Sequence, residues 1–156
     1  MPGAAWRDGI AMTGWTIRKA EPNDAESLGR CIEAAYAEWR ITDLPPMSDD
    51  CAAEIAENDV WVAETDGDIV GGLILVPSRG FMLLANVAVH PEWRGAGIGR
   101  RLLMLAETEA TGHGYAEIRL NTHAGMPETI RLYSRNGWTQ IGRQGNRITM
   151  RKALAN

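Results

Sequence analysis

The sequence predicts an α+β fold in a single domain, with a mixed central sheet of about seven strands flanked by about four helices. Its 156 residues suit one domain, and its composition, 45% hydrophobic and 23% charged, is that of an ordinary globular protein. Helical and strand-like periodicities alternate along most of the chain, and no apolar run approaches the ~20 residues of a membrane span. We expect residues 1–13 to form a flexible leader and residues 14–155 the domain.

Local turn and capping signals support this order of elements. Pro22-Asn23-Asp24 opens the first helix, with Asn23 or Asp24 as its expected N-cap, and Asp66-Gly67 between apolar runs is typical of a β-hairpin. The apolar stretch 81–89, with Asn86 as its one polar residue, predicts a central strand covered on both faces. The predicted strands are 15–20, 60–64, 69–76, 81–89, 116–121, 138–142 and 147–152, and the predicted helices are about 23–39, about 48–57, the glycine loop to about 111, and 127–136.

A glycine-rich loop, residues 94–100 (Arg-Gly-Ala-Gly-Ile-Gly-Arg), lies between the expected central strand and an amphipathic helix. Glycines let backbone N–H groups surround an anion at a helix N-terminus, where the macrodipole also favours negative charge. Arg94, Arg100 and Arg101 oppose that dipole by roughly a few tenths of a kcal/mol each, which makes sense if a polyphosphate binds there. The Walker pattern is absent, and the dinucleotide pattern fails because Arg100 stands in place of its third glycine.

The stretch Asn86–Gly99 resembles the acetyl-CoA signature of the GNAT N-acetyltransferases, a strand followed by Arg/Gln-x-x-Gly-x-Gly/Ala, which Arg94, Gly97 and Gly99 fit. The segment Leu132–Trp138 is similar to the family's Leu-Tyr-x-x-x-Gly-Phe segment, and the order of elements matches over nearly the whole chain. The resemblance implies a GNAT-like fold and an acetyl-CoA-dependent N-acetyltransferase, with acetyl-CoA as the acetyl donor and no metal.

The resemblance also implies roles for individual residues. The main chain of Val87 and Val89 would hydrogen-bond the pantetheine arm, and an N–H near Val87 would polarise the acetyl carbonyl. Tyr133 would protonate the departing thiolate, since a phenol of pKa ~10 is protonated at neutral pH. The expected cofactor-binding residues are Val87, Ala88, Val89, Arg94, Gly95, Ala96, Gly97, Ile98, Gly99, Arg100, Asn121 and Thr129.

The acceptor is expected to be a primary amine of a small molecule. Tyr36, Glu38, Trp39 and Asp43 lie at the end of the first helix and in the following loop, where the family shapes its acceptor pocket. An acidic and aromatic lining suits a cationic amine. Residues 1–90 carry 6 Lys/Arg against 15 Asp/Glu, which agrees with a cationic acceptor.

Two departures from the family leave alternatives open. Many members use a strand Glu as general base, and residues 83–86 contain none, so a water relay or a carboxylate from the first helices would be needed. The branch that acetylates ribosomal-protein N-termini has a Glu where Asn121 stands. The absence of this Glu argues against acetylation of a protein N-terminus. The alternatives are acetylation of a protein N-terminus or lysine, and a non-catalytic acyl-CoA-binding module.

Composition limits which partners and which cellular compartment we expect. The net charge of −4 argues against general nucleic-acid binding, and the chain offers no candidate membrane segment. Cys31 and Cys51 cannot form a disulfide framework and fit a reducing cytoplasm. His90, His113 and His123 have no metal-ligand spacing, and the resemblance suggests a homodimer.

Overall fold

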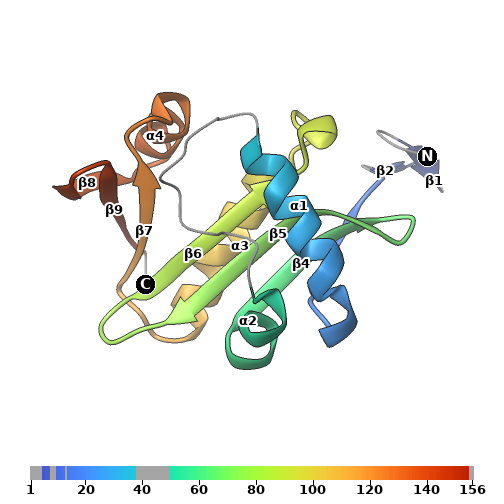
Figure 1. The fold of residues 1–156 in the computed structure, drawn as a ribbon, viewed down its shortest axis with the longest axis horizontal. Helices are drawn as coiled ribbons and strands as arrows, with labels where there is room; N and C mark the ends of the chain where they lie inside the picture. Colours follow the sequence, from blue (N-terminus) through green and yellow to red (C-terminus); the bar gives the residue numbers. More distant parts are fainter. Residues whose placement is uncertain (1–4, 8–9, 13, 38–49, 155–156) are drawn as a thin grey trace.

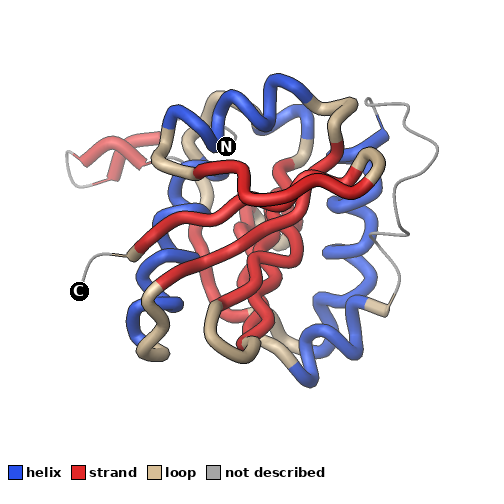
Figure 2. The backbone as a smooth tube through the Cα atoms, turned by 90° about the vertical axis from the view of Figure 1, so that its left-hand side faces the viewer, coloured by secondary structure: helices blue, strands red, loops and turns tan. Residues whose placement is uncertain are grey.

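A computed structural model describes residues 5–7, 10–12, 14–37 and 50–154. In this part of the chain, seven strands form one mixed sheet in the order β3-β4-β5-β6-β7-β9-β8, and helices cover both of its faces (Figures 1 and 2). Neighbouring strands are antiparallel except β6 and β7, which are parallel. With its four α-helices, this architecture confirms the predicted α+β fold.

The α-helices and the strands of the main sheet lie where the local patterns predict them, and each of these strands ends within two residues of its expected position. The strands are β3 (Thr16–Lys19), β4 (Asp59–Thr65), β5 (Asp68–Pro77), β6 (Met82–Val89), β7 (Glu117–His123), β8 (Thr139–Gln144) and β9 (Arg147–Ala153). The helices are η1 (Pro22–Asp24), α1 (Ala25–Ala37), α2 (Cys51–Glu57), η2 (Pro91–Trp93), α3 (Ile98–Gly112) and α4 (Pro127–Arg135).

Two short strands precede the main sheet. β1 (Ala5–Arg7) and β2 (Ile10–Met12) pair antiparallel with each other as a separate two-stranded sheet, set apart at the right of Figure 1. The segment expected as a flexible leader therefore contains two paired strands. The domain boundary at residue 14 stays a prediction.

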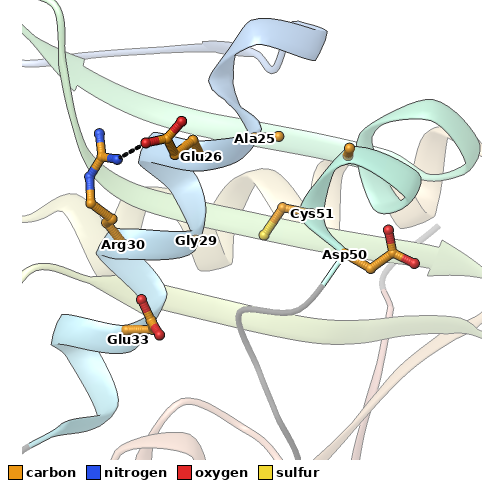
Figure 3. Close-up of a pocket in the computed structure, with 8 residues that line it drawn as sticks. Ala25, Glu26, Gly29, Arg30, Glu33, Asp50 and Cys51 are labelled. Atoms are coloured by element: carbon orange, nitrogen blue, oxygen red, sulfur yellow. Dashed lines mark hydrogen bonds and ion pairs between the residues drawn. The ribbon is translucent and has the colours of Figure 1, made fainter.

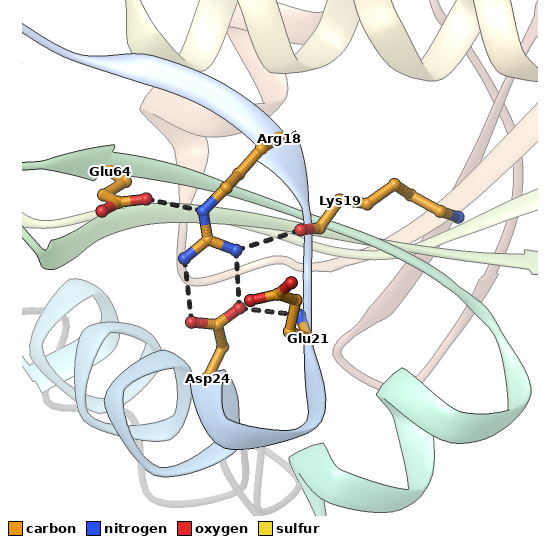
Figure 4. A network of polar contacts seen from close by, with 5 residues as sticks. All are labelled: Arg18, Lys19, Glu21, Asp24 and Glu64. Carbon is orange, nitrogen blue, oxygen red and sulfur yellow. Dashed lines mark hydrogen bonds and ion pairs between the residues drawn. The ribbon is translucent and has the colours of Figure 1, made fainter.

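An ion-pair network joins the edge of the sheet to the start of α1 (Figure 4). The Arg18 guanidinium donates to both carboxylate oxygens of Asp24, at 2.7 and 3.0 Å, and also to Glu64 on the neighbouring strand. Asp24 accepts a further hydrogen bond from the backbone N–H of Glu21, which is the residue that caps this first turn in place of Asn23 or Asp24. The bonded Arg18 guanidinium holds the pKa of the Asp24 carboxyl below its usual value of 3.8.

We expect Asp24→Asn to lower the free energy of unfolding by about 1–3 kcal/mol at pH 7, because a buried charge-assisted hydrogen bond is lost. A carboxyl whose pKa is lower in the folded protein stabilises the fold when the pH is above its pKa in the unfolded chain. This contribution disappears as the pH falls through its pKa in the folded protein. The difference between variant and wild type should therefore shrink below about pH 3.8 in urea unfolding.

The exposed Glu26–Arg30 pair on α1 provides a matched control. Glu26→Gln should change stability by less than about 0.5 kcal/mol, as is usual for an exposed helical ion pair. An Asp24→Asn difference that stayed the same at pH 7 and pH 3 would contradict an electrostatic origin.

The sheet packs closely against helices on both faces because β5 carries two adjacent glycines. A Cβ at Gly72 would meet the fully buried side chain of Leu28 of α1 at 2.4 Å. On the other face, a Cβ at Gly71 would lie 2.8 Å from the Ile98 side chain and 3.3 Å from the Ala88 carbonyl oxygen. Gly71 therefore lets the first residue of α3 approach the sheet, which brings the glycine loop against β6.

We expect Gly71→Ala to destabilise the protein by about 1–3 kcal/mol through overpacking. Alanine also restricts the unfolded chain, which offsets at most about 1 kcal/mol of this loss. Gly142→Ala in β8 is the control, since its Cβ would meet nothing within 4 Å. Chemical unfolding measures both, and equal stability of the two variants would refute the close-packing argument.

Candidate active site

The parallel strands β6 and β7 pair over only part of their length. The ladder joins Met82, Leu83 and Leu84 of β6 to residues 118–120 of β7. Beyond Leu84 the two strands diverge, as Figure 1 shows at the centre of the sheet. The β7-facing backbone of residues 85–89 is therefore left without a strand partner.

A β-bulge lies where the two strands separate. Ile74 of β5 faces Asn86 and Leu75 faces Leu84, so Ala85 is an extra residue with no partner in β5. A bulge bends its strand and increases the local twist. It directs the second half of β6 away from β7 and opens the sheet at its centre.

This opening is part of a groove of about 1700 Å³. Its lining comes from the end of α1, β6, the glycine loop, α3, β7, α4 and the turn between β8 and β9. Of the residues predicted to bind the cofactor, Ala96 belongs to the glycine loop without lining the groove. Those that do line it are Val87, Ala88, Val89, Arg94, Gly95, Gly97, Ile98, Gly99, Arg100, Asn121 and Thr129.

The glycine loop has the backbone shape that an anion site at a helix N-terminus needs. Gly95 and Gly97 adopt φ angles of +83° and +91°, which side chains with a Cβ rarely adopt, and Gly97 directly precedes α3. Arg94 donates to the Ala35 carbonyl oxygen at 3.1 Å and so ties the loop to α1. Arg100 makes no hydrogen bond or ion pair with the described residues, which leaves its guanidinium available for an anion.

Tyr133 lies on the α4 side of the groove. Its side chain is 6% exposed and packs against the Trp138 ring, with centroids 5.6 Å apart. Burial and the neighbouring Tyr36 raise the pKa of the Tyr133 phenol above its ordinary value of 10. The hydroxyl is therefore protonated at neutral pH and can act as a donor.

Tyr36 approaches the groove from the opposite face of the sheet, at the last turn of α1. Its hydroxyl donates to Asn86 Oδ1 at 3.4 Å, and burial raises its pKa to about 12. Of the other residues predicted for the acceptor pocket, Glu38, Trp39 and Asp43 lie outside the described residues.

Several groove residues were not assigned a role from the sequence. Ala85 carries no sequence signal, because the bulge depends on how β5 and β6 pair. Asn86 did give a signal, as the one polar residue of an apolar strand, and its side chain is buried beside Tyr36. His123 and Arg147 face each other as partners in β7 and β9, and both line the groove.

A second, more open pocket of about 550 Å³ lies between α1 and the start of α2 (Figure 3). Glu26 and Arg30 pair with each other on its rim, and Cys51 of α2 is buried at its side. Of the residues predicted for cofactor, acceptor or catalysis, none that the structure describes lines it. The groove at β6 is therefore the candidate active site.

Comparison with known proteins agrees with this geometry. The family model described as "Acetyltransferase (GNAT) domain" matches residues 56–140, more than half of the chain. The chain belongs to the GNAT acetyltransferase family. Acetyltransferase Atu2258 of Agrobacterium fabrum is 32% identical over 119 residues, which cover 73% of this chain and 84% of that protein. The uncharacterized N-acetyltransferase YjgM of Escherichia coli is 26% identical, over 85% of this chain and 86% of that protein.

Solved structures share the fold of this GNAT domain. The PaiA N-acetyltransferase of Thermoplasma acidophilum, crystallised in complex with coenzyme A, superposes with a TM-score of 0.79 at 22% identity. The alignment covers 90% of this chain and 99% of that one. None of the helices in the described ranges is long and apolar enough to cross a membrane.

The protein is thus an N-acetyltransferase of the GNAT family, and its acetyl donor is acetyl-CoA. The groove fits this donor. The positive-φ glycines, the α3 N-terminus and Arg100 suit a pyrophosphate, and the unpaired β6 edge offers N–H and C=O groups to amides. When bound, acetyl-CoA supplies an activated acyl group on a thioester.

We expect Arg100→Gln to weaken binding of coenzyme A about tenfold, because a charge-assisted contact with phosphate is lost. Isothermal titration calorimetry measures this effect. Arg131→Gln, on α4 but outside the groove lining, should keep the wild-type affinity. Equal losses in both variants would mean that Arg100 acts only through the overall charge of the protein.

Proposed function

We propose that this GNAT enzyme acetylates a primary amine of a small molecule by direct attack of the amine on the thioester, with Tyr133 as the general acid. One observation carries the assignment. The buried Tyr133 lines the groove where β6 leaves its backbone unpaired, and no other tyrosine but Tyr36 lines it within the described residues.

In this reaction the amine nitrogen forms a bond to the carbonyl carbon and the carbon–sulfur bond breaks. The Val87 N–H would donate to the carbonyl oxygen as negative charge develops there, and one such donor contributes about 3–4 kcal/mol. The sulfur would take the proton of the Tyr133 hydroxyl. The proton released by the attacking nitrogen would then restore the phenol, so the enzyme leaves the cycle unchanged.

The amine must be neutral when it attacks, and the groove supports water as the acceptor of its proton. Among the described residues, the carboxylates lining the groove are Glu107 and Glu128. Glu107 is paired with Lys152 at 3.0 Å, and Glu128 lies at the start of α4. The Tyr36 phenol, with a pKa of about 12, stays protonated and orients groups by hydrogen bonding.

Two observations support a small amine as the acceptor. Tyr36 and Asn86 offer an aromatic face and an amide where the groove reaches α1, which suits an amine of limited size. Asn121 stands where the branch that acetylates ribosomal-protein N-termini has a Glu, and it accepts a hydrogen bond from Thr149 at 2.7 Å. The buried cysteines Cys31 and Cys51 support a cytoplasmic location, and we propose a homodimer by family resemblance.

We expect Tyr133→Phe to lower kcat about 100-fold and to change the affinity for coenzyme A by less than about threefold, because a general acid acts on the chemical step. Free thiol released from acetyl-CoA measures turnover over polyamines, amino acids, aminoglycosides and short peptides. Tyr115→Phe is the matched control, since the Tyr115 hydroxyl bonds the Ser78 carbonyl outside the groove lining.

Turnover with one class of small amine, reduced only in Tyr133→Phe, would support the proposal. Turnover with peptides alone would assign a protein acceptor. Wild-type kcat in Tyr133→Phe would rule out the acid role, and coenzyme A binding without turnover on any acceptor would indicate an acyl-CoA-binding module.

A further inference from the structure

Outside the groove, three potential metal ligands from distant parts of the chain meet at the end of α3. Asp59 is the first residue of β4, and Glu109 and His113 lie one helical turn apart at the C-terminus of α3. One ligand atom from each lies within 4.8 Å of the other two. None of the three lines the groove.

The buried member of this cluster has an unsatisfied oxygen. The Asp59 side chain is only 9% exposed, and its Oδ1 is bound to the ammonium of Lys19. Its Oδ2 is buried and has no hydrogen-bond partner among the described residues. The Trp61 Nε1–H beside this carboxylate is also buried and makes no hydrogen bond at normal distance with the described residues. A buried carboxylate oxygen without a close donor is costly, so a proton or a cation at Oδ2 would stabilise it.

The electrostatics of the cluster also favour a cation. The ligand atoms of Asp59 and Glu109 lie within 4.8 Å of each other, so a cation between them offsets two neighbouring carboxylates. The C-terminus of a helix carries a partial negative charge, and Glu109 adds to it. Lys19 is the cation that partly offsets this charge, and its side chain is 57% exposed.

We propose that Asp59, Glu109 and His113 bind a divalent transition-metal cation and so join the end of α3 to the start of β4. Two carboxylates and an imidazole form the mixed oxygen and nitrogen donor set that Zn²⁺ and its neighbours accept. Residues four apart on a helix present their side chains on one face, and Asp59 supplies the third ligand. Ligands of a tetrahedral Zn²⁺ lie roughly 3.4 Å apart, so small side-chain rotations close the site.

Lys19 then competes with the metal for Asp59. Because its long side chain is mostly exposed and lies 5.1 Å from the Trp61 ring centroid, it can turn to solvent without leaving a buried gap. The bound cation takes over the neutralising role of the ammonium and adds a partner for Oδ2.

The test is titration of metal-stripped protein with Zn²⁺ by calorimetry, together with thermal unfolding with and without Zn²⁺. We expect one site per chain and a higher unfolding temperature with Zn²⁺, since a ligand that binds only the native state stabilises it. Glu109→Gln and His113→Gln should each weaken binding at least about tenfold, as loss of a ligand does. Lys19→Gln should tighten it about threefold or more, because the competing ammonium is gone.

His90→Gln is the matched control, because His90 caps η2 at the far end of β6 and should not alter the titration. Glu109 and His113 are not buried, so Glu109→Gln and His113→Gln should both fold. Thermal unfolding of each variant in the presence of a chelator checks this. Absence of Zn²⁺ binding to the wild type would overturn the proposal in favour of a proton shared by Asp59 and Glu109. Binding that both ligand variants retain would overturn it in favour of adventitious surface binding.

Discussion

The separation of β6 and β7 after Leu84 is the constraint on which the rest of the site depends. A continuous ladder would leave no free backbone on β6 and would keep the two faces of the sheet apart. The bulge at Ala85 ends this continuity. It leaves polar main-chain groups at the centre of the sheet, where a linear amide-containing ligand can pair with them as an added strand would. It also brings Tyr36 and Tyr133, from opposite faces, close enough for one phenol to oppose ionisation of the other.

Helix α3 links the groove to the rest of the molecule. Its first residue packs over Gly71, and the close approach holds the glycine loop beside the open edge of β6. Its N-terminus faces the groove, where exposed backbone N–H groups favour an anion. Its C-terminus bears Glu109 and His113, where the dipole favours a cation. The polarity of one helix thus suits opposite charges at its two ends.

Features that depend on adjacent residues could be predicted from the sequence. The Asp66-Gly67 hairpin forms because both residues accept positive φ, and the glycine loop has its anion-binding shape for the same reason. The apolar stretch of β6 became the central strand of the sheet, as predicted. The expected cover on both faces was wrong, because only alternate residues of β6 are buried and the other face lines the groove. The N-cap of the first helix was assigned wrongly, because the capping box at Glu21 and Asp24 also depends on Arg18 from the preceding strand.

The sequence by itself determined the order of the helices and of the strands in the main sheet, the family and the glycine loop, because each depends on residue spacing within a short stretch of chain. Only the tertiary structure decided where β6 leaves β7, since a bulge depends on the register of the partner strand. It also decided the contact of Tyr36 with Asn86 and the meeting of Asp59 with Glu109 and His113. Tyr36 lies 50 positions from Asn86, and Asp59 is about as far from Glu109 and His113. No local pattern predicts that the packing of the helices on the sheet brings these residues together.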